Sequence, residues 1–155
     1  MDINIVKIDY DNSQHAADLI QMLDVYSRDP MGQDGPLNDY AREHLVEGLK
    51  ELGTAFSMLA YRGDVAVGMA NCIFGFSTFY ARKLINIHDI AVKPEVRGEG
   101  LGERLLQAVE KEALAHNCCK ITLEVRDDNR ARNLYERFGF TEGKVPMAFM
   151  EKVLI

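Results

Sequence analysis

The strongest constraint in the sequence is a glycine-rich turn that lies between a strand pattern and a long helix pattern. Arg97-Gly98-Glu99-Gly100-Leu101-Gly102 follows the apolar run Ile87–Val92 and opens a stretch to His116 whose apolar residues recur at helical spacing. Glycines let a backbone approach a ligand closely, and the first N–H groups of a helix have no partner within it. The turn therefore either makes a tight connection or binds an anion such as a pyrophosphate. Three glycines with an arginine favour anion binding.

Two familiar phosphate-binding loops fit this turn poorly. A Walker A loop needs G-x-x-x-x-G-K-[ST], and the sequence contains neither Gly-Lys-Ser nor Gly-Lys-Thr. A Rossmann fingerprint, G-x-G-x-x-G, requires a glycine where Glu103 stands. Glu124 does lie about where a ribose-binding acid belongs, but a Rossmann unit normally opens its domain, and here a long stretch precedes the turn. A nucleotide-dependent oxidoreductase is thereby disfavoured without being eliminated.

Periodicity elsewhere predicts an α/β domain with a mixed sheet flanked by helices. The glycines and prolines of Arg28–Pro36 predict a loop, and Gly53 and Gly139 predict helix ends. One or two closing strands are expected between Phe140 and Val153. The other expected strands are 3–8, 55–61, 65–74, 84–92 and 120–125, and the expected helices are 13–23, 45–52, 100–116 and 130–138.

The composition predicts a single domain over residues 1–155. With 47% apolar and 27% charged residues, the 155-residue chain is of ordinary globular composition and size. A formal charge of −6 without a basic cluster argues against nucleic-acid binding and mildly favours a cationic substrate. No basic stretch leads into an apolar run at the start, and no apolar run is long enough for a membrane span, so neither export nor insertion is expected.

Cysteine and histidine usage predicts a cytoplasmic protein without a metal site. Three cysteines, of which Cys118 and Cys119 are adjacent, make a poor disulfide framework and fit a reducing compartment. This pair lies where a helix pattern gives way to a strand, a place typical of buried small side chains rather than of a nucleophile. The four histidines are scattered, and no C-x-x-C or H-x-x-x-H spacing occurs.

Two ordered motifs resemble the GNAT superfamily of acyl-CoA-dependent N-acetyltransferases. Val92, Pro94 and the turn Arg97–Gly102 are similar to its acyl-CoA signature, V-x-P-x-x-R/Q-x-x-G-x-G/A. The segments Leu123–Asn129 and Ala131–Phe140 resemble the family's second block, so that the resemblance covers about residues 84–142. Two motifs in the right order are more specific than either alone.

The second motif departs from the family pattern at one point. The family commonly has N-x-x-A-x-x-L-Y, whereas Asn129 and Ala131 are separated by one residue only. Either Asp128 takes the place of the asparagine, or the helix begins one residue late.

The resemblance implies a fold and a cofactor. The fold is GNAT-like: a mixed, mostly antiparallel sheet of six to seven strands, flanked by about four helices, with the fourth and fifth strands splayed apart. The cofactor is acetyl-CoA, with its pyrophosphate on the N–H groups of the turn, Arg97 or Arg104 near a phosphate, and the N–H near Ile90 polarising the thioester carbonyl. The residues expected to bind the cofactor are Ile90, Ala91, Val92, Arg97, Gly98, Glu99, Gly100, Leu101, Gly102, Asn129, Arg132 and Tyr135.

The implied reaction is direct attack of a neutral primary amine on the thioester within a ternary complex. Tyr135 is the candidate acid, because a phenol can donate a proton to the departing thiolate. For the base, strand alternation places Asn86 and His88 on one face of their strand, with Ile90 and Val92, and Asp89 on the other. His88 titrates near neutrality, Asn86 stands beside it, and Glu124 and Asp89 are further candidates. The base stays open.

The amine site is expected at the loop Pro30–Leu37, the start of the following helix and the aromatic residues Phe76, Phe79 and Tyr80. The expected partner is a small-molecule or peptide amine, with no nucleic acid and no membrane, and a homodimer fits the resemblance. Besides an N-acetyltransferase, two hypotheses stand: a non-catalytic acyl-CoA-binding sensor or interaction module on the same scaffold, and the oxidoreductase. The combination of Tyr135 with the polar pair Asn86 and His88 favours catalysis.

Overall fold

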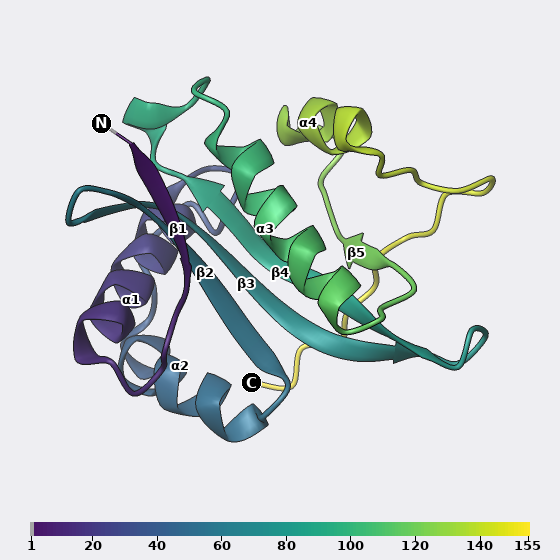
Figure 1. Ribbon diagram of the computed structural model, residues 1–155. Coiled ribbons are helices and arrows are strands. Elements are labelled where there is room, and N and C mark those ends of the chain that lie inside the picture. The colour runs from purple at the N-terminus through teal and green to yellow at the C-terminus, as the bar shows by residue number, and fades with distance from the viewer. Residues whose placement is uncertain (1) are drawn as a thin grey trace.

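A computed structural model describes residues 2–155 as one sheet with helices on both faces (Figure 1). The sheet has five strands in the order β1-β2-β3-β4-β5. The strands are β1 (Ile3–Lys7), β2 (Ala55–Arg62), β3 (Val65–Ser77), β4 (Arg82–Val92) and β5 (Ile121–Leu123). The helices are α1 (Ser13–Arg28), α2 (Asp39–Leu52), α3 (Leu101–Ala115) and α4 (Ala131–Phe138), and a 3-10 turn, η1 (Pro94–Val96), joins β4 to α3.

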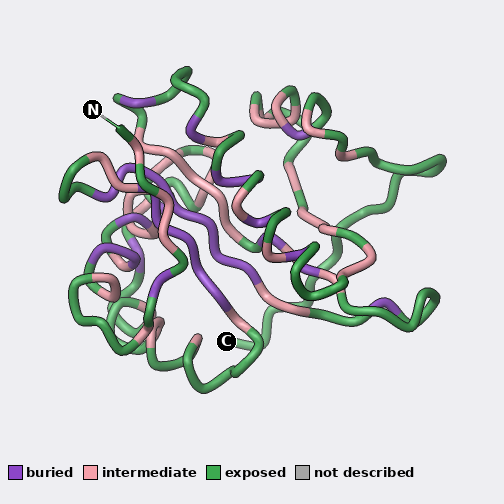
Figure 2. Tube along the Cα trace, viewed as in Figure 1, coloured by how far each residue is buried: buried purple, intermediate pink, exposed green. Residues whose placement is uncertain are grey.

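Two apolar clusters hold the layers together. On one face of the sheet, the stripe of α3 that includes Leu105 and Val109 packs on residues of β2, β3 and β4, as the helical spacing predicts. On the opposite face, Leu19 and Met22 of α1 pack against Met69 of β3, with α2 at the edge of the cluster. Figure 2 shows the buried positions running along the central strands and along the side of α3 that faces them. The sheet is therefore the middle layer of three.

A polar cap and two glycines set helix ends, and the two glycines, Gly53 and Gly139, lie where the sequence predicts them. The Asn12 side chain accepts hydrogen bonds from the N–H groups of Gln14 and His15 at 3.0 Å and so starts α1. Gly53 with φ 75° ends α2, and Gly139 with φ 110° ends α4. Because L-residues rarely adopt positive φ, glycine is needed at both C-caps.

The edge between β4 and β5 opens part-way along. β1 to β4 pair antiparallel, whereas β5 runs parallel to β4 over only three residue pairs, which end at Ile87 with Leu123. β4 then continues alone on that side through residues 88–92. The Lys93 N–H donates to the Val67 carbonyl on the β3 side at 2.9 Å, so by antiparallel alternation the N–H of Ile90 faces the open side. The splay of the fourth and fifth strands is thus present.

The number of strands differs from the prediction. Six to seven were expected, with one or two after Phe140, but the described residues form five, and residues 139–155 form no strand. From Thr141 on, the side chains of this segment, among them Phe149 and Leu154, are exposed and drawn in green in Figure 2, whereas Phe140 still packs against the core. β-propensity reflects packing against a neighbouring strand, and Pro146 interrupts the run because it lacks an N–H. Apolar content alone therefore overstated the strand count.

A β-bulge in β4 overturns the predicted division of its faces. Asn71 pairs with Asp89 and the next residue, Cys72, pairs with Ile87, so His88 is the extra residue on β4. An extra residue reverses the alternation beyond it. Ile90 therefore lies on the α3 face with Ile87, while Asp89 lies on the α1 face. The prediction that Asn86 and His88 share a face with Ile90 and Val92 is wrong for this reason.

The predicted aromatic wall of the amine site is also wrong. Phe76, Phe79 and Tyr80 lie at the tip of the β3–β4 hairpin, where all three are exposed. The glycine-rich turn follows the other end of β4, so the whole length of this strand separates the two features (Figure 1). The strands simply extend further than their apolar runs indicate, and this carries the aromatic residues away from the turn.

The burial of α3 leads to a stability test. Leu105→Ala removes a fully buried side chain from the contact of α3 with the sheet, and we expect a loss of about 2–5 kcal/mol in the free energy of unfolding. Leu114→Ala on the same helix, where the side chain is 71% exposed, should change it by less than about 0.5 kcal/mol. Urea denaturation measures both. Equal losses for the two variants would contradict this orientation of α3.

Candidate active site

The turn before α3 presents unpartnered amides to open space. Gly98 and Gly100 have φ of 83° and 81°, and Gly100 is an N-cap without a side-chain cap. The first backbone bond of the helix runs from the Arg104 N–H to the Gly100 carbonyl at 3.2 Å. Across residues 2–155, no acceptor is found for the N–H groups of residues 98–103. A Cβ placed on Gly98 or Gly100 would meet no atom within 4 Å, so the surroundings fit a pyrophosphate.

The arginines near the turn are engaged within the protein. Arg97 donates from Nη2 to Oδ2 of Asp29 at 2.8 Å and from Nε to the Val92 carbonyl at 3.3 Å. Arg104 donates to the Ile3 carbonyl at 2.8 Å. Glu99 forms an ion pair with Arg62 from the end of β2. A contact of Arg97 or Arg104 with a phosphate stays a prediction, and for Arg97 it requires competition with a carboxylate.

The second motif forms the start of α4. The Asn129 side chain accepts the Ala131 N–H at 2.9 Å, and α4 begins at Ala131. The N-cap itself is Arg130, which has no side-chain cap, so which residue takes the place of the family's asparagine stays a prediction. Arg132 is held by Asp127 and Glu142, each at 2.6 Å. Cofactor contacts of Asn129 and Arg132 stay predictions.

Tyr135 is brought close to the turn by tight packing of α4 on α3. A Cβ on Gly102 would lie 2.7 Å from Cδ2 of Leu134, so a glycine permits this approach. Tyr135 is buried, and its ring meets Phe140 edge-on at 6.0 Å. Burial raises the pKa of Tyr135 to about 12, with a smaller contribution from Tyr26. The phenol is therefore protonated at neutral pH and able to donate a proton.

Three predicted catalytic residues form one hydrogen-bonded group. The Asn86 amide nitrogen donates to Oγ1 of Thr122 at 3.0 Å and to Oε1 of Glu124 at 3.4 Å. Nδ1 of His88 lies 2.6 Å from Oδ1 of Asn86. An amide oxygen only accepts, so Nδ1 of His88 is the donor in this contact. Glu124 and His88 are both exposed. Asn86 thus orients His88 and Glu124 across the β4–β5 pair.

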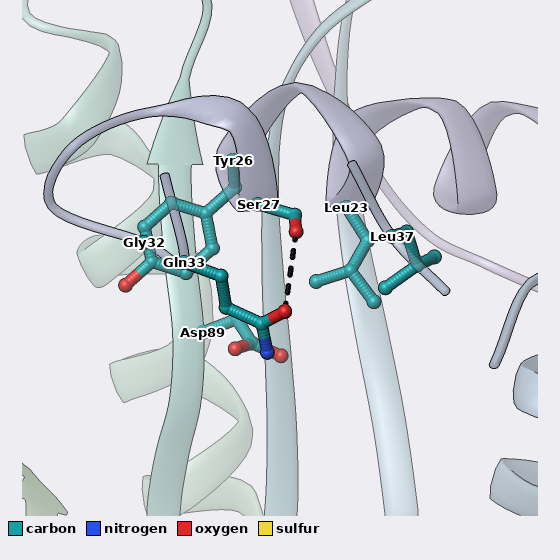
Figure 3. A pocket seen from close by; sticks show the side chains of 7 residues that line it. All are labelled: Leu23, Tyr26, Ser27, Gly32, Gln33, Leu37 and Asp89. Carbon is teal, nitrogen blue, oxygen red and sulfur yellow. Dashed lines mark hydrogen bonds between the residues drawn. The ribbon is translucent and has the colours of Figure 1, made fainter. Parts of the chain in front are cut away.

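Asp89 faces a cavity beneath the α1–α2 loop. The cavity has a volume of about 160 Å³, and Figure 3 shows the Asp89 carboxylate below the amide end of Gln33 and beside Tyr26. Oγ of Ser27 lies 3.5 Å from Oε1 of Gln33. The other lining residues are Leu23, Gly32 and Leu37. A Cβ on Gly32 would collide with the Tyr26 carbonyl oxygen, so the loop depends on glycine there.

A buried polar chain supports Asp89 from behind. Asn71 donates to Oδ2 of Asp89 at 3.1 Å, Ser57 donates to Oδ1 of Asn71 at 2.6 Å, and the Tyr10 hydroxyl lies 2.8 Å from Oγ of Ser57. Burial raises the pKa of the Asp89 carboxyl, which outweighs the lowering by the Asn71 hydrogen bond and by His88. A half-buried carboxyl with a raised pKa that opens on a cavity is suited to accept a proton.

Tyr26 is a site residue that sequence patterns do not single out, whereas Gln33 lies within the loop expected to form the amine site and Asp29 directly precedes it. Tyr26 lies in the last turn of α1, beyond the expected helix 13–23, and Asp29 and Gln33 lie in the loop that follows. Their positions depend on how the loop folds over β4, a long-range contact. The dense glycine and proline content of this loop was the one available signal: Gly32, Gln33 and Leu37 do line this cavity, and an amine site at residues 30–37 stays a prediction.

Comparison with known proteins identifies the family. The model of the acetyltransferase (GNAT) family matches residues 19–140. The chain belongs to the GNAT family. Acetyltransferases of this family use acetyl-CoA, and binding of its pyrophosphate by the amides of residues 98–103 stays a prediction. The match includes the turn, the bulged strand β4, α3 and most of the segment around α4.

Sequence relatives of this GNAT protein are acetyltransferases of an amine. Over 79 residues it is 39% identical to thialysine N-epsilon-acetyltransferase of Bos taurus and 38% identical to that of Sus scrofa. The matched stretch is 50% of this chain and 46% of each relative. The chain therefore spans about half the length of the curated relatives that it matches.

Solved structures similar to this GNAT chain share its fold. An integron cassette protein from the mobile metagenome of V. cholerae superimposes with a TM-score of 0.82 at 19% identity, covering 99% of this chain and 94% of that one. AAC(6')-Iy, solved in complex with a bisubstrate analog of CoA and acetylneamine, gives a TM-score of 0.78 at 16% identity, covering 99% and 100%. No helix within residues 2–155 combines the length and the apolarity that a membrane span requires.

The glycines of the turn give a binding test. Gly100→Ala places a methyl group in the open space before the amides and strains a backbone with φ 81°, so the KM for acetyl-CoA should rise by about tenfold or more, with a stability loss of about 1–2 kcal/mol. Gly53→Ala imposes similar strain at φ 75°, far from the turn, and should lower stability without raising this KM. Steady-state kinetics and thermal unfolding separate the two effects. An unchanged KM in Gly100→Ala would contradict pyrophosphate binding at the turn.

Proposed function

We propose that this protein transfers the acetyl group of acetyl-CoA to the primary amine of a small cationic molecule, by direct attack within a ternary complex. The observation that carries the proposal is the convergence of three features on the β4–β5 opening: unpartnered amides at the turn, the buried phenol of Tyr135, and the Asp89 carboxylate in its cavity. When bound, acetyl-CoA supplies an activated thioester carbonyl. The residues of this chain then position the amine, polarise the thioester carbonyl and transfer the protons.

Asp89 is the base in this proposal. An amine arrives protonated at neutral pH and must lose a proton before it can attack. The Asp89 carboxylate opens on the cavity, whereas His88 is exposed on the surface and hydrogen-bonded to Asn86. Asn71 donates to Oδ2 of Asp89, and within residues 2–155 no donor bonds to Oδ1. His88, Glu124 and Asn86 then act at the rim of the opening, where His88 passes protons to solvent.

Tyr135 and Ile90 serve the other half of the reaction. The Ile90 N–H faces the open side of β4, where no strand pairs with it, and it donates to the carbonyl that gains negative charge. Tyr135 holds its proton at neutral pH because its pKa is about 12, and it delivers this proton to the leaving sulfur. A sensor that only bound acyl-CoA would have no use for a buried acid and a half-buried base on opposite sides of one opening.

The cavity supports a small, linear amine as the acceptor. Its volume of about 160 Å³ admits an aminoalkyl group rather than a folded protein surface, and Tyr26 and Leu23 give it an apolar wall. The Asp89 carboxylate attracts a cationic head, in line with the overall charge of −6. The relatives named for thialysine modify an amine of this kind. Thiol release measured against a panel of diamines, amino acids, aminoglycosides and peptides tests the acceptor class.

Substitution of Asp89 should separate activity from stability. Asp89→Asn keeps the acceptor oxygen for Asn71 but removes the base, so kcat should fall by about 10²–10⁴-fold.

The raised pKa of Asp89 means that the folded state binds this proton more tightly than the unfolded chain, so the ionised carboxylate costs stability above that pKa. Asp89→Asn should therefore raise the unfolding midpoint at neutral pH. In the wild type, kcat should fall as the pH decreases through the Asp89 pKa. Retained kcat in this variant would exclude Asp89 as the base.

Substitution of Tyr135 should affect turnover and leave cofactor binding almost unchanged. Tyr135→Phe preserves the packing against Phe140 and removes the proton donor, so kcat should fall by about 10²-fold with little change in the dissociation constant of CoA. Tyr80→Phe, at the exposed hairpin tip, is the matched control and should behave as wild type. Kinetics and calorimetry provide the two measurements. Wild-type turnover in Tyr135→Phe would remove this residue from the mechanism.

A further inference from the structure

The loop between α1 and α2, residues 29–38, is tied to both sides of the β4–β5 opening. On one side, Oδ2 of Asp29 accepts from Nη2 of Arg97 at 2.8 Å. On the other side, the Pro30 carbonyl accepts from Nη1 of Arg126 at 3.2 Å. Arg97 follows β4 and Arg126 follows β5, so the loop spans the ends of the two diverging strands. The loop therefore lies at the entrance to the opening.

Asp29 organises this loop as well as holding Arg97. Its Oδ1 accepts the Met31 N–H at 2.9 Å, and its carbonyl accepts the N–H groups of Gly32 at 2.8 Å and Asp34 at 3.2 Å. The Arg97 guanidinium is the main cause of a lowered pKa at Asp29, so the carboxylate is ionised at neutral pH. We call residues 29–38 the acceptor loop, because they cover the cavity proposed for the amine. The Asp29 side chain thus connects the fold of the acceptor loop to the position of Arg97 in the glycine-rich turn.

Gly32 and Gln33, in the middle of the loop, form part of the wall of the Asp89 cavity. Figure 3 shows the loop bringing the Gln33 side chain directly above the Asp89 carboxylate. The hydroxyl of Ser27, which is buried, donates to the Gly35 carbonyl at 2.7 Å and secures the far end of the loop. The loop as folded with Asp29 paired to Arg97 therefore partly covers the proposed base.

The pair also opposes anion binding at the turn. While Arg97 is bonded to Asp29, the carboxylate neutralises its charge, and a phosphate beside the amides of residues 98–103 meets a like charge nearby. A guanidinium forms charge-assisted hydrogen bonds with carboxylates and with phosphates alike. Asp29 and a cofactor phosphate are thus alternative partners for the same cation.

We propose that the Asp29–Arg97 ion pair is a latch that couples the acceptor loop to acyl-CoA binding, an inference that rests on the proposed function. A phosphate of the cofactor takes Arg97 from Asp29, and the loop over the Asp89 cavity is released only then. Because coupling between two sites is reciprocal, Asp29 lowers the affinity for the cofactor by the same free energy with which it keeps the acceptor cavity closed.

The first test measures CoA binding by calorimetry. In Asp29→Asn, the amide oxygen still accepts the Met31 N–H, so the loop retains its turn, but Arg97 is no longer neutralised. We expect CoA to bind at least about fivefold more tightly than to wild type. Asp34→Asn removes the same charge from the same loop, at an exposed side chain without an ion pair among residues 2–155, and should leave CoA affinity unchanged. Equal or weaker binding to Asp29→Asn than to wild type would overturn the latch.

The second test asks whether Asp29 acts through Arg97. In an Arg97→Gln background, Asp29→Asn should no longer tighten CoA binding, and an undiminished gain there would refute the coupling.

Hydrogen exchange of residues 29–36 should increase when CoA is added to wild type and should not respond to CoA in Asp29→Asn. If wild type itself does not bind CoA, the proposed function fails and the latch with it. If all variants bind CoA with one affinity, only the latch fails.

Discussion

The site depends on the early end of pairing between β4 and β5. After Ile87 and Leu123 the two strands part, and the backbone groups of β4 that would have bonded to β5 face an opening. In a sheet, unpaired N–H groups are costly unless water or a ligand satisfies them. Here they lie beside the unpartnered amides of the turn before α3. The fold therefore concentrates free donors in one place, and this is what an extended, negatively charged cofactor requires.

The bulge at His88 determines which side chains surround that opening. Without it, Asp89 would face α3 and the apolar core, where a carboxylate would be costly to bury. With it, Asp89 lies on the α1 face, supported by Asn71 and open to a cavity, while Ile90 returns to the core. One extra residue thus changes a buried charge into a candidate base. Bulges are frequent near active sites for this reason.

The α1–α2 loop connects the two halves of the site. It covers the acceptor cavity, and it is bonded to arginines that follow β4 and β5. Loops of this kind are commonly held by few contacts and are therefore able to respond to a ligand. In this protein the responding contact is a single ion pair between partly exposed groups. Such a pair contributes little to stability, which suits a contact that has to break.

The sequence by itself determined the local features and, through them, the family. The glycines of residues 98–102, the helical stripe of α3, the cap at Asn12 and the helix end at Gly139 act over a few residues, so their consequences follow from local chemistry. Tertiary structure alone decided the bulge at His88, the pairing of Asp29 with Arg97, and the failure of residues 139–155 to form a strand. Each of these depends on which distant segment lies alongside, and neither periodicity nor propensity contains that information.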